Sequence, residues 1–404
     1  MKIKKIKARQ ILDSRGNPTV EADVILENNI LGRASVPSGA SKGYKEAVEL
    51  RDGESNYLGL SVEKAIYNID KIINKLLVGI DVEEQEKIDN IMIKYDNTKN
   101  KSKLGANAML AVSMACLKAS SKLNKLEVYQ YLKGNNIPKI MVNVLNGGFH
   151  ASNNLSFQEF MIVPQKQTIE ENIQMSSEVF HFLGKILRQK GYSTSVGDEG
   201  GYAPEIKTVE EALDLLVLAI KESGYTIGKD IVLAIDVAAN SIYKDNKYLV
   251  DNKFYTTDEL IELYEKIISK YHIVSIEDPF YENDQYGFIK FTEKFGKDIK
   301  IVGDDLFVTN KDYLLDGISK KMCNAIIIKP NQIGTFTEVL NVVSLAVKNN
   351  YIPILSHRSG ETEDVILPHL AVGLDIKFVK MGSMSRGERI AKYNELLRIS
   401  ESLK

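Results

Sequence analysis

The chain has 404 residues, of which 44% are hydrophobic and 26% charged, the balance of a globular protein with room for two or three domains. A formal net charge of -2 argues against nucleic acid or an anionic membrane as a partner, because both need an excess of Lys and Arg. No apolar run has the length of a membrane span, and the two cysteines form no CxxC pair, so we expect a cytoplasmic protein.

Strands and loops are predicted for the N-terminal segment. The basic residues between positions 2 and 9 alternate with Ile3 and Ile6, which favours the solvent side of an edge strand over a targeting signal. Residues 19–26 alternate apolar and polar side chains, as a half-buried antiparallel strand does. Residues 36–43 are small, polar and glycine-rich, and predict a loop.

Helices are predicted between residues 62 and 133. The first carries Ala65, Ile69, Ile72 and Leu76 at helical spacing, and residues 106–123 are rich in Ala, Met and Leu. Strands followed by helices indicate an α+β unit. A link with Gly134 and Pro138 comes next, so we predict one domain over residues 1–134 and a second over residues 135–404.

Short apolar runs then alternate with helical stretches, which is the βα pattern of a parallel sheet. The runs lie at residues 231–235, 273–276, 300–302, 325–328 and 352–355. The residues after them, Glu277, Asp304, Lys329 and His357, are 25 to 28 positions apart, enough for a strand, a helix and two loops. A longer step between Asp236 and Glu277 contains a hairpin-like insertion at residues 243–248.

Each predicted strand ends in a reactive side chain. In chain order these are Asp236, Glu277 with Asp278, Asp304 with Asp305, Lys329, His357-Arg358-Ser359, and Lys380 after the short run 378–379. Active sites of barrels lie at the carboxyl ends of the strands, so the groups should converge. Converging carboxylates repel one another, and a hard cation such as magnesium or calcium would relieve the repulsion. The alternative for a single strand-end Asp is a helix N-cap.

Lys329 follows a fully apolar run, and burial would lower its pKa and leave a neutral amine. Such an amine can remove a weakly acidic C–H proton, while a neighbouring metal stabilises the resulting enediolate. The alternative is a structural ion pair with Asp304 or Asp305.

Two further segments add acids and a histidine. Glu199 lies in the glycine-rich stretch 197–201, and His150 and Glu159 follow shortly after residues 146–148. A Glu199–Glu159 pair would raise the pKa of one member and supply a general acid. The alternatives are a plain surface turn at residues 197–201 and a structural role for His150.

Several motifs together resemble the enolase family, which interconverts 2-phosphoglycerate and phosphoenolpyruvate. The matching segments are Asp13-Ser-Arg-Gly-Asn-Pro-Thr-Val20, Val36-Pro-Ser-Gly-Ala-Ser41, Lys103-Leu-Gly-Ala-Asn107, Gly197-Asp-Glu-Gly-Gly201, Ser275-Ile-Glu-Asp-Pro279, Lys329 with Asn331-Gln-Ile-Gly334, and Ser356-His-Arg-Ser-Gly-Glu-Thr-Glu-Asp364. The resemblance implies a (β/α)8-type barrel with irregular first units, preceded by an N-terminal α+β capping domain with lid loops. A lysine base combined with magnesium is the general pattern of the enolase superfamily.

The resemblance also implies a role for each matching residue. Magnesium ligands would be Asp236, Glu277 and Asp304, with Ser41 for a second ion that arrives with substrate. Lys329 would be the base at C2, Glu199 with Glu159 the acid side, and His150 and His357 further catalytic residues. Arg358 and Ser359 would bind the phosphate and Lys380 the carboxylate, with Gln158 counted among the substrate-binding residues. A homodimer or higher oligomer is implied, with Arg15 near the subunit contact.

The chain departs from the family at two places near the expected site. Lys42 follows Ser41 where the family usually has threonine, and we hypothesise that it shifts the magnesium optimum; an unchanged magnesium dependence in Lys42→Thr would disprove this. Residues 240–242 read Asn-Ser-Ile where the family usually has Ser-Glu and an aromatic residue. Two alternatives therefore stay open: a related lyase on another phospho- or phosphono-acid, and a non-catalytic binding protein. A secondary location at the cell surface also stays open.

Overall fold

A three-stranded antiparallel sheet begins the chain, and β2 is its middle strand. The computed structural model describes residues 1–39, 45–53 and 56–404, and the strands are β1 (Ile3–Leu12), β2 (Pro18–Leu26) and β3 (Leu31–Ser35). The predicted edge strand is confirmed as β1, with Ile3 and Ile6 buried between exposed lysines. The alternation predicted for residues 19–26 is confirmed in β2, whose Val20, Ala22 and Val24 are fully buried.

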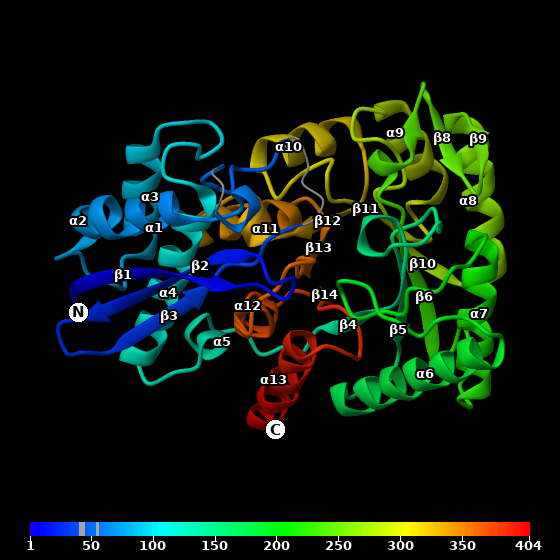
Figure 1. The fold of residues 1–404 in the computed structure, drawn as a ribbon, viewed down its shortest axis with the longest axis horizontal. Helices are drawn as coiled ribbons and strands as arrows, with labels where there is room; N and C mark the ends of the chain where they lie inside the picture. Colours follow the sequence, from blue (N-terminus) through cyan, green and yellow to red (C-terminus); the bar gives the residue numbers. More distant parts are fainter. Residues whose placement is uncertain (40–44, 54–55) are drawn as a thin grey trace.

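Helices pack on one side of this sheet (Figure 1). They are α1 (Glu63–Tyr67), the π-helical segment η2 (Asn68–Ile73), α2 (Asn74–Leu77), α3 (Gln85–Asp96), α4 (Ala106–Leu123) and α5 (Val128–Tyr131), with the short η1 at Asn56–Gly59 before them. The helical spacing predicted for this segment is confirmed in α1, η2 and α2. Ile73 and Leu77 are buried there, whereas Ile72 and Leu76 are only half-buried. The π turn lengthens the repeat and so shifts the buried face by one residue.

Eight strands then close into a barrel, as predicted. They are β4 (Lys139–Asn146), β5 (Glu159–Pro164), β6 (Ile231–Asp236), β10 (Ile273–Glu277), β11 (Lys300–Gly303), β12 (Ala325–Ile328), β13 (Ile352–Ser356) and β14 (Phe378–Lys380). β5 runs antiparallel to both β4 and β6, and the remaining neighbours are parallel. The expected irregular first units of the barrel are therefore present.

Alternation along the strands decides which side chains enter the barrel. In β12, Ala325 and Ile327 belong to a small apolar cluster made only of barrel-strand residues, while Ile326 and Ile328 belong to the large cluster shared with the helices. Lys329 follows in the inward register. By the same alternation, side chains at the following positions near the open end of the barrel are expected to face inward: Glu159, Asp236, Glu277, Asp304, Lys329, Ser356 and Lys380.

Helices surround the barrel, and their N-caps are not the strand-end acids. The helices are α6 (Ile169–Gln189), α7 (Val209–Glu222), α8 (Thr257–Tyr271), α9 (Gln285–Phe295), α10 (Lys311–Lys320), α11 (Phe336–Lys348), α12 (Ile366–Gly373) and α13 (Gly387–Leu403). Side-chain caps come from Thr168, Thr208, Thr256, Asp284, Asn310 and Thr335. This removes helix capping as the reason for acids at positions 236, 277 and 304.

Shorter elements connect these helices and strands. The insertion predicted at residues 243–248 is a three-stranded sheet of β7 (Tyr243–Lys244), β8 (Lys247–Val250) and β9 (Lys253–Tyr255). The 3₁₀ turns are η3 (Gly148–His150), η4 (Ala239–Ser241) and η5 (Pro330–Gln332). Among the helices that the structure describes, none has the length and apolar character needed to cross a membrane.

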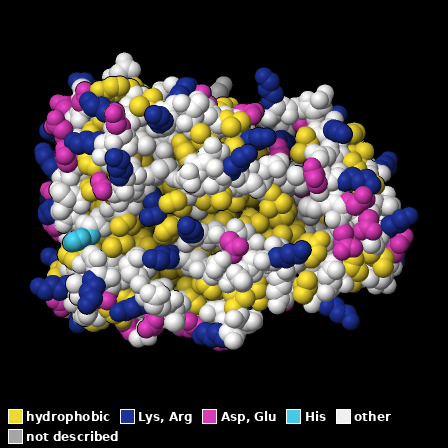
Figure 2. Space-filling view, turned by 180° about the vertical axis from the view of Figure 1, so that it is seen from behind, with side chains coloured by type: hydrophobic (Ala, Val, Ile, Leu, Met, Phe, Trp, Pro, Cys, Tyr) yellow, Lys and Arg dark blue, Asp and Glu magenta, His cyan; other side chains and the backbone are white. Residues whose placement is uncertain are grey.

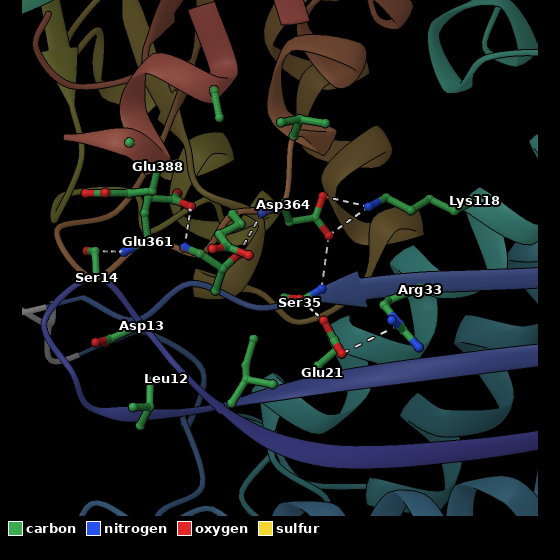
Figure 3. A pocket seen from close by; sticks show the side chains of 16 residues that line it. Leu12, Asp13, Ser14, Glu21, Arg33, Ser35, Lys118, Glu361, Asp364 and Glu388 are labelled. Atoms are coloured by element: carbon green, nitrogen blue, oxygen red, sulfur yellow. Dashed lines mark hydrogen bonds and ion pairs between the residues drawn. The ribbon is translucent and has the colours of Figure 1, made fainter. Parts of the chain in front are cut away.

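The N-terminal sheet lies against the barrel and shares an apolar cluster with it. Lys118 of α4 pairs with Asp364 at 2.6 Å, and the backbone amide of Ser35 donates to the same carboxylate. A cavity of about 980 Å³ opens beside these contacts, with Glu21 and Arg33 on its strand side (Figure 3). On the rear of the molecule, apolar side chains fill a hollow across the middle of the face, and both charge signs are present around it (Figure 2).

Candidate active site at the open end of the barrel

The antiparallel strand β5 explains how Glu159 reaches the strand-end acids. Glu159 is the first residue of β5, and it pairs across the sheet with Asp236 at the end of β6 and Asn146 at the end of β4. A strand that runs against its neighbours presents its beginning where they present their ends. Glu159 and Asp236 therefore lie at the same mouth of the barrel.

Lys380 lies among the buried acids. Its Nζ is 2.7 Å from Glu277 Oε2, 3.0 Å from Glu159 Oε2 and 3.9 Å from Asp236 Oδ2. Burial raises the pKa of Asp236 to about 7 and that of Glu277 to about 8; nearby acids add to both increases, and Lys380 opposes them. Carboxylates this crowded remain charged together only beside a cation.

The pKa of Lys329 is raised in this structure, whereas burial alone predicts a lowered one. Its Nζ donates to Asp304 Oδ2, while Gln332 Nε2 donates to Asp304 Oδ1 at 2.9 Å. Burial favours the neutral form, but the attraction of Asp304 outweighs it and raises the pKa of Lys329 above its ordinary value. The ion pair that was the alternative for Lys329 is present.

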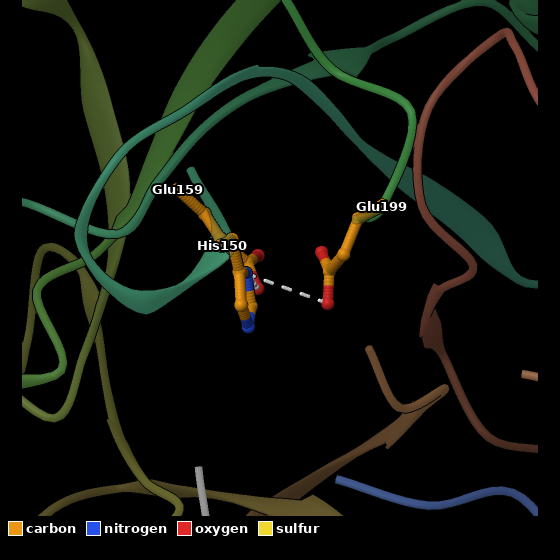
Figure 4. Close-up of side chains that lie close together, drawn as sticks. All are labelled: His150, Glu159 and Glu199. Atoms are coloured by element: carbon orange, nitrogen blue, oxygen red, sulfur yellow. Dashed lines mark ion pairs between the residues drawn. The ribbon is translucent and has the colours of Figure 1, made fainter. Parts of the chain in front are cut away.

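A cluster of two glutamates and a histidine forms the other side of the mouth (Figure 4). His150 Nδ1 lies 3.6 Å from Glu159 Oε1 and 3.5 Å from Glu199 Oε1. Glu199 Oε2 accepts from Asn143 Nδ2 at 2.9 Å and lies 3.2 Å from His357 Nε2. All five side chains are buried.

The two glutamates of this cluster have opposite pKa shifts. Burial, with the charge of Glu199, raises the pKa of Glu159 well above its ordinary value. Burial by itself would raise the pKa of Glu199 too. The neighbouring His150 and His357 have the opposite and larger effect, so the pKa of Glu199 is lowered. The predicted split within the pair is thus present, and Glu159 is the member whose pKa is raised.

Arg358 is held by an acid from the N-terminal unit. Its Nη1 lies 3.0 Å from Glu46 Oε2 and donates to Asn331 Oδ1 at 2.9 Å, and its Nη2 donates to Glu46 Oε1 at 3.2 Å. Eight of the predicted site residues nonetheless line one cavity, together with Ser356: His150, Gln158, Glu159, Glu199, Lys329, His357, Arg358 and Ser359. The predicted metal ligands Asp236, Glu277 and Asp304 are not part of its lining, nor is Lys380. The volume of the cavity is about 10 Å³, and a cavity of roughly that size holds about one water.

Asp278 and Asp305, the acids next to the predicted metal ligands, accept hydrogen bonds from neighbouring turns. Asp278 accepts from the amides of Asp304 and Asp305, each at 2.8 Å, and so fixes the turn after β11. Asn240, where the chain departs from the family, donates to Asp305 Oδ2 at 2.8 Å and accepts from the amide of Glu282 at 2.9 Å. Asn240 therefore links two turns at the barrel mouth.

The donor set fits a hard cation. Asp236, Glu277 and Asp304 offer only oxygen, the ligand that magnesium and calcium prefer. Among the described residues, Glu277 Oε1 and Gln158 Oε1 are buried oxygens without a hydrogen-bond partner. Within the part of the chain that the structure describes, the groups that bring ligand atoms within 4.8 Å of one another are His150/Glu159/Glu199 and Asp278/Asp304/Asp305, and the predicted trio is not one of them. Acidic groups that could hold a metal are thus present, while Ser41 and Lys42 lie outside the described residues.

Several side chains that bear on the site were missed in the sequence. Asn143 occupies the barrel strand β4, and the inward alternation of that strand could have indicated it. Glu46 and Gln332 contact Arg358 and Asp304 from elsewhere in the chain, and no local pattern marks such contacts. Arg389 contacts His357 from α13, where a charged residue in a helix normally predicts a solvated face.

A closed barrel whose mouth combines buried acids, two lysines and a carboxylate–histidine cluster defines a barrel enzyme equipped for acid–base chemistry. Residues 135–404 match the family model described as "Enolase, C-terminal TIM barrel domain", and residues 3–132 match "Enolase, N-terminal domain". The chain belongs to the enolase family and is therefore a lyase of the phosphopyruvate hydratase type.

Curated relatives agree over the full length. The chain is 51% identical over 408 residues to the enolase of Ehrlichia ruminantium (strain Welgevonden), covering 100% of this chain and 97% of the relative. The enolase of strain Gardel gives the same identity and coverage. The enolase of Ehrlichia canis (strain Jake) is 52% identical over 406 residues, covering 99% of this chain and 96% of the relative.

Proposed function

We propose that this protein catalyses the reversible, magnesium-dependent dehydration of 2-phosphoglycerate to phosphoenolpyruvate, a step of glycolysis and gluconeogenesis. The observation that supports it most is that one cavity is lined by a lysine, a glutamate pair and an arginine. These are the groups needed to take a proton, to give one, and to bind a phosphate.

In this proposal Lys329 takes the C2 proton. Asp236, Glu277 and Asp304 hold a magnesium ion, which when bound offsets their repulsion and stabilises the negative charge that develops on the substrate carboxylate. A cation on Asp304 would weaken the attraction of this carboxylate for Lys329, so the ammonium form of Lys329 would be favoured less and its amine could accept a proton. Lys380 and Gln158 lie beside these acids and are assigned to the carboxylate end of the substrate.

The glutamate pair supplies the proton that leaves with the C3 hydroxyl. In this proposal Glu159 gives the proton beside a charged Glu199. His357 Nε2, 3.2 Å from Glu199, is the neighbouring donor for the carboxylates left behind, and His150 lies 3.5 Å from Glu199. Arg358 and Ser359 are assigned to the phosphate, for which a guanidinium offers two parallel hydrogen bonds. Ser41 is assigned to a second magnesium ion on the basis of the family resemblance alone.

We also propose a cytoplasmic homodimer or larger homo-oligomer. Both cysteines are free and buried, which suits a reducing compartment. Arg15, assigned to the subunit contact by resemblance, lies 3.8 Å from Asp13 of its own chain and donates to the carbonyl of Ser38 at 3.4 Å. Light scattering during size-exclusion chromatography tests the oligomer, and a monomer at micromolar concentration would disprove it.

The function is tested by following the absorbance of the enol product from 2-phosphoglycerate, with and without magnesium. We expect turnover only with the metal. Absence of turnover by folded, magnesium-loaded protein would disprove the substrate assignment and favour a related phospho- or phosphono-acid, which the same assay can screen.

A further inference from the structure

Arg389 of α13 is a completely buried cation beside the candidate site. Its exposure is 0%, and it is among the largest fully buried side chains of the described residues. Burying an arginine is unfavourable unless its N–H groups are hydrogen-bonded. Here Nη1 is 2.6 Å from both His357 Nδ1 and the carbonyl oxygen of Arg358, and Nη2 is 2.6 Å from the carbonyl of Ser359 and 3.1 Å from that of Asp198.

The contact with His357 has only one possible direction. A guanidinium has five N–H donors and no acceptor, so His357 Nδ1 must be the acceptor and carries no proton. In the neutral ring the proton then resides on Nε2. That nitrogen lies 3.2 Å from Glu199 Oε2, so its N–H points at the carboxylate.

Arg389 also joins the two loops that carry these groups. The carbonyls of Arg358 and Ser359 belong to the loop after β13, and the carbonyl of Asp198 immediately precedes Glu199. One guanidinium therefore fixes both the tautomer of His357 and the separation of its ring from the loop of Glu199.

We propose that Arg389 is a positioning residue that holds His357 as the Nε2–H tautomer and directs this donor at Glu199. The proposal rests on the proposed function only for the role of Glu199. When the glutamate pair gives its proton to the departing C3 hydroxyl, two adjacent carboxylates are left charged. A donor already fixed on Glu199 makes a charge-assisted hydrogen bond and lowers the free energy of that state.

Lys392, one helical turn further along α13, provides a matched control. It is 1% exposed, and its Nζ lies 3.0 Å from the carbonyl of Thr362 and 3.0 Å from Glu361 Oε2. It thus supports the same loop from the same helix with a buried cation. Unlike Arg389, Lys392 has no hydrogen bond with His357, so Lys392→Met tests loop support without touching the His357 ring.

The first experiment reads the tautomer directly, without turnover. Protein labelled with nitrogen-15 histidine is examined by NMR at neutral pH, and His357→Gln assigns the signal among the five histidines. We expect wild type and Lys392→Met to show the Nε2–H tautomer, and Arg389→Met to lose it. An Nδ1–H tautomer or an imidazolium in the wild type would overturn the proposal, whether or not 2-phosphoglycerate proves to be the substrate.

The second experiment measures kcat and KM. We expect Arg389→Met to lower kcat about 10- to 100-fold, the size of one hydrogen bond to a charged group, with a smaller change in KM. Arg389→Lys, which keeps a donor, should recover part of the loss. Equal losses of kcat in Arg389→Met and Lys392→Met would overturn the proposal, because general loop support would then explain both. If Arg389→Met does not fold, the proposal is tested by the tautomer of the wild type and by the tautomer and kcat of Arg389→Lys. A folded Arg389→Lys protein that shows the Nδ1–H tautomer and the full wild-type kcat would overturn the proposal.

Discussion

Glu46 forms an ion pair with Arg358, the residue to which the substrate phosphate is assigned. Replacing Glu46 should therefore tighten phosphate binding. The carboxylate contacts Arg358 with both oxygens, at 3.0 and 3.2 Å, and both side chains are almost fully buried, with side-chain exposures of 8% and 4%. The site cavity of about 10 Å³ leaves no room for a phosphate beside this pair. A phosphate bound to Arg358 as proposed would compete with Glu46 for the same N–H groups.

The magnitude follows from the hydrogen bonds that are given up. A hydrogen bond to a charged group contributes about 1.5–3 kcal/mol, and each 1.4 kcal/mol corresponds to about a factor of ten in affinity. Glu46→Gln keeps the shape but loses the charge, so we expect phosphate-bearing ligands to bind about 10- to 100-fold more tightly. The free protein should become less stable by about 1–3 kcal/mol, because the buried Arg358 loses the charge of Glu46.

Titration calorimetry with inorganic phosphate, together with KM for 2-phosphoglycerate, measures the effect. Glu338→Gln is the control, because it breaks the Lys101–Glu338 pair of 2.5 Å, which does not border the site cavity. The control should lose stability and keep its phosphate affinity. Unchanged or weaker phosphate binding by folded Glu46→Gln would refute the reasoning that Glu46 competes for Arg358.

Two further predictions concern stability. Asn240→Ala removes the partner of Asp305 and of the Glu282 amide, so it should lower the free energy of unfolding by about 1–3 kcal/mol in urea; a change below about 0.5 kcal/mol would contradict the bridging role. Burial lowers the pKa of His357 from 6.5 to about 4. Between pH 6.5 and 4, His357 therefore binds a proton in the unfolded chain but not in the native protein. The free energy of unfolding should fall by about 3 kcal/mol as the pH drops across this range. His357→Gln should lack that part of the pH dependence in matched urea titrations, and identical curves would exclude His357 as its source.

Local patterns marked six of the eight barrel strands and the order of the groups that follow them, whereas β4 and β5 were implied only by the family resemblance. Acids and lysines after apolar runs could be recognised because strand alternation and barrel geometry turn positions in the sequence into positions on one rim. Even Glu159 was found through its motif, although its arrival at the rim depends on the reversed direction of β5. The division of the chain at residue 134 stays a prediction.

Partners distant in the sequence could not be predicted in the same way. Burial alone suggested a neutral Lys329, whereas its charge depends on Asp304, which faces it from the neighbouring strand. Arg389 and Glu46 reach the site from a helix and from the N-terminal unit, and only tertiary packing brings them there. The buried face of the first helix moved by one residue because a π turn, which has no simple sequence signal, lies within it.

The central claim is that Lys329 removes the C2 proton while the glutamate pair serves a separate, later step. Exchange of the C2 hydrogen of 2-phosphoglycerate with deuterated water, followed by NMR in the presence of magnesium, separates the two. We expect Lys329→Ala to lose exchange and dehydration together, by about 10²-fold or more, and Glu199→Gln to lose dehydration while it keeps C2 exchange. Exchange at the wild-type rate in folded Lys329→Ala would contradict the account.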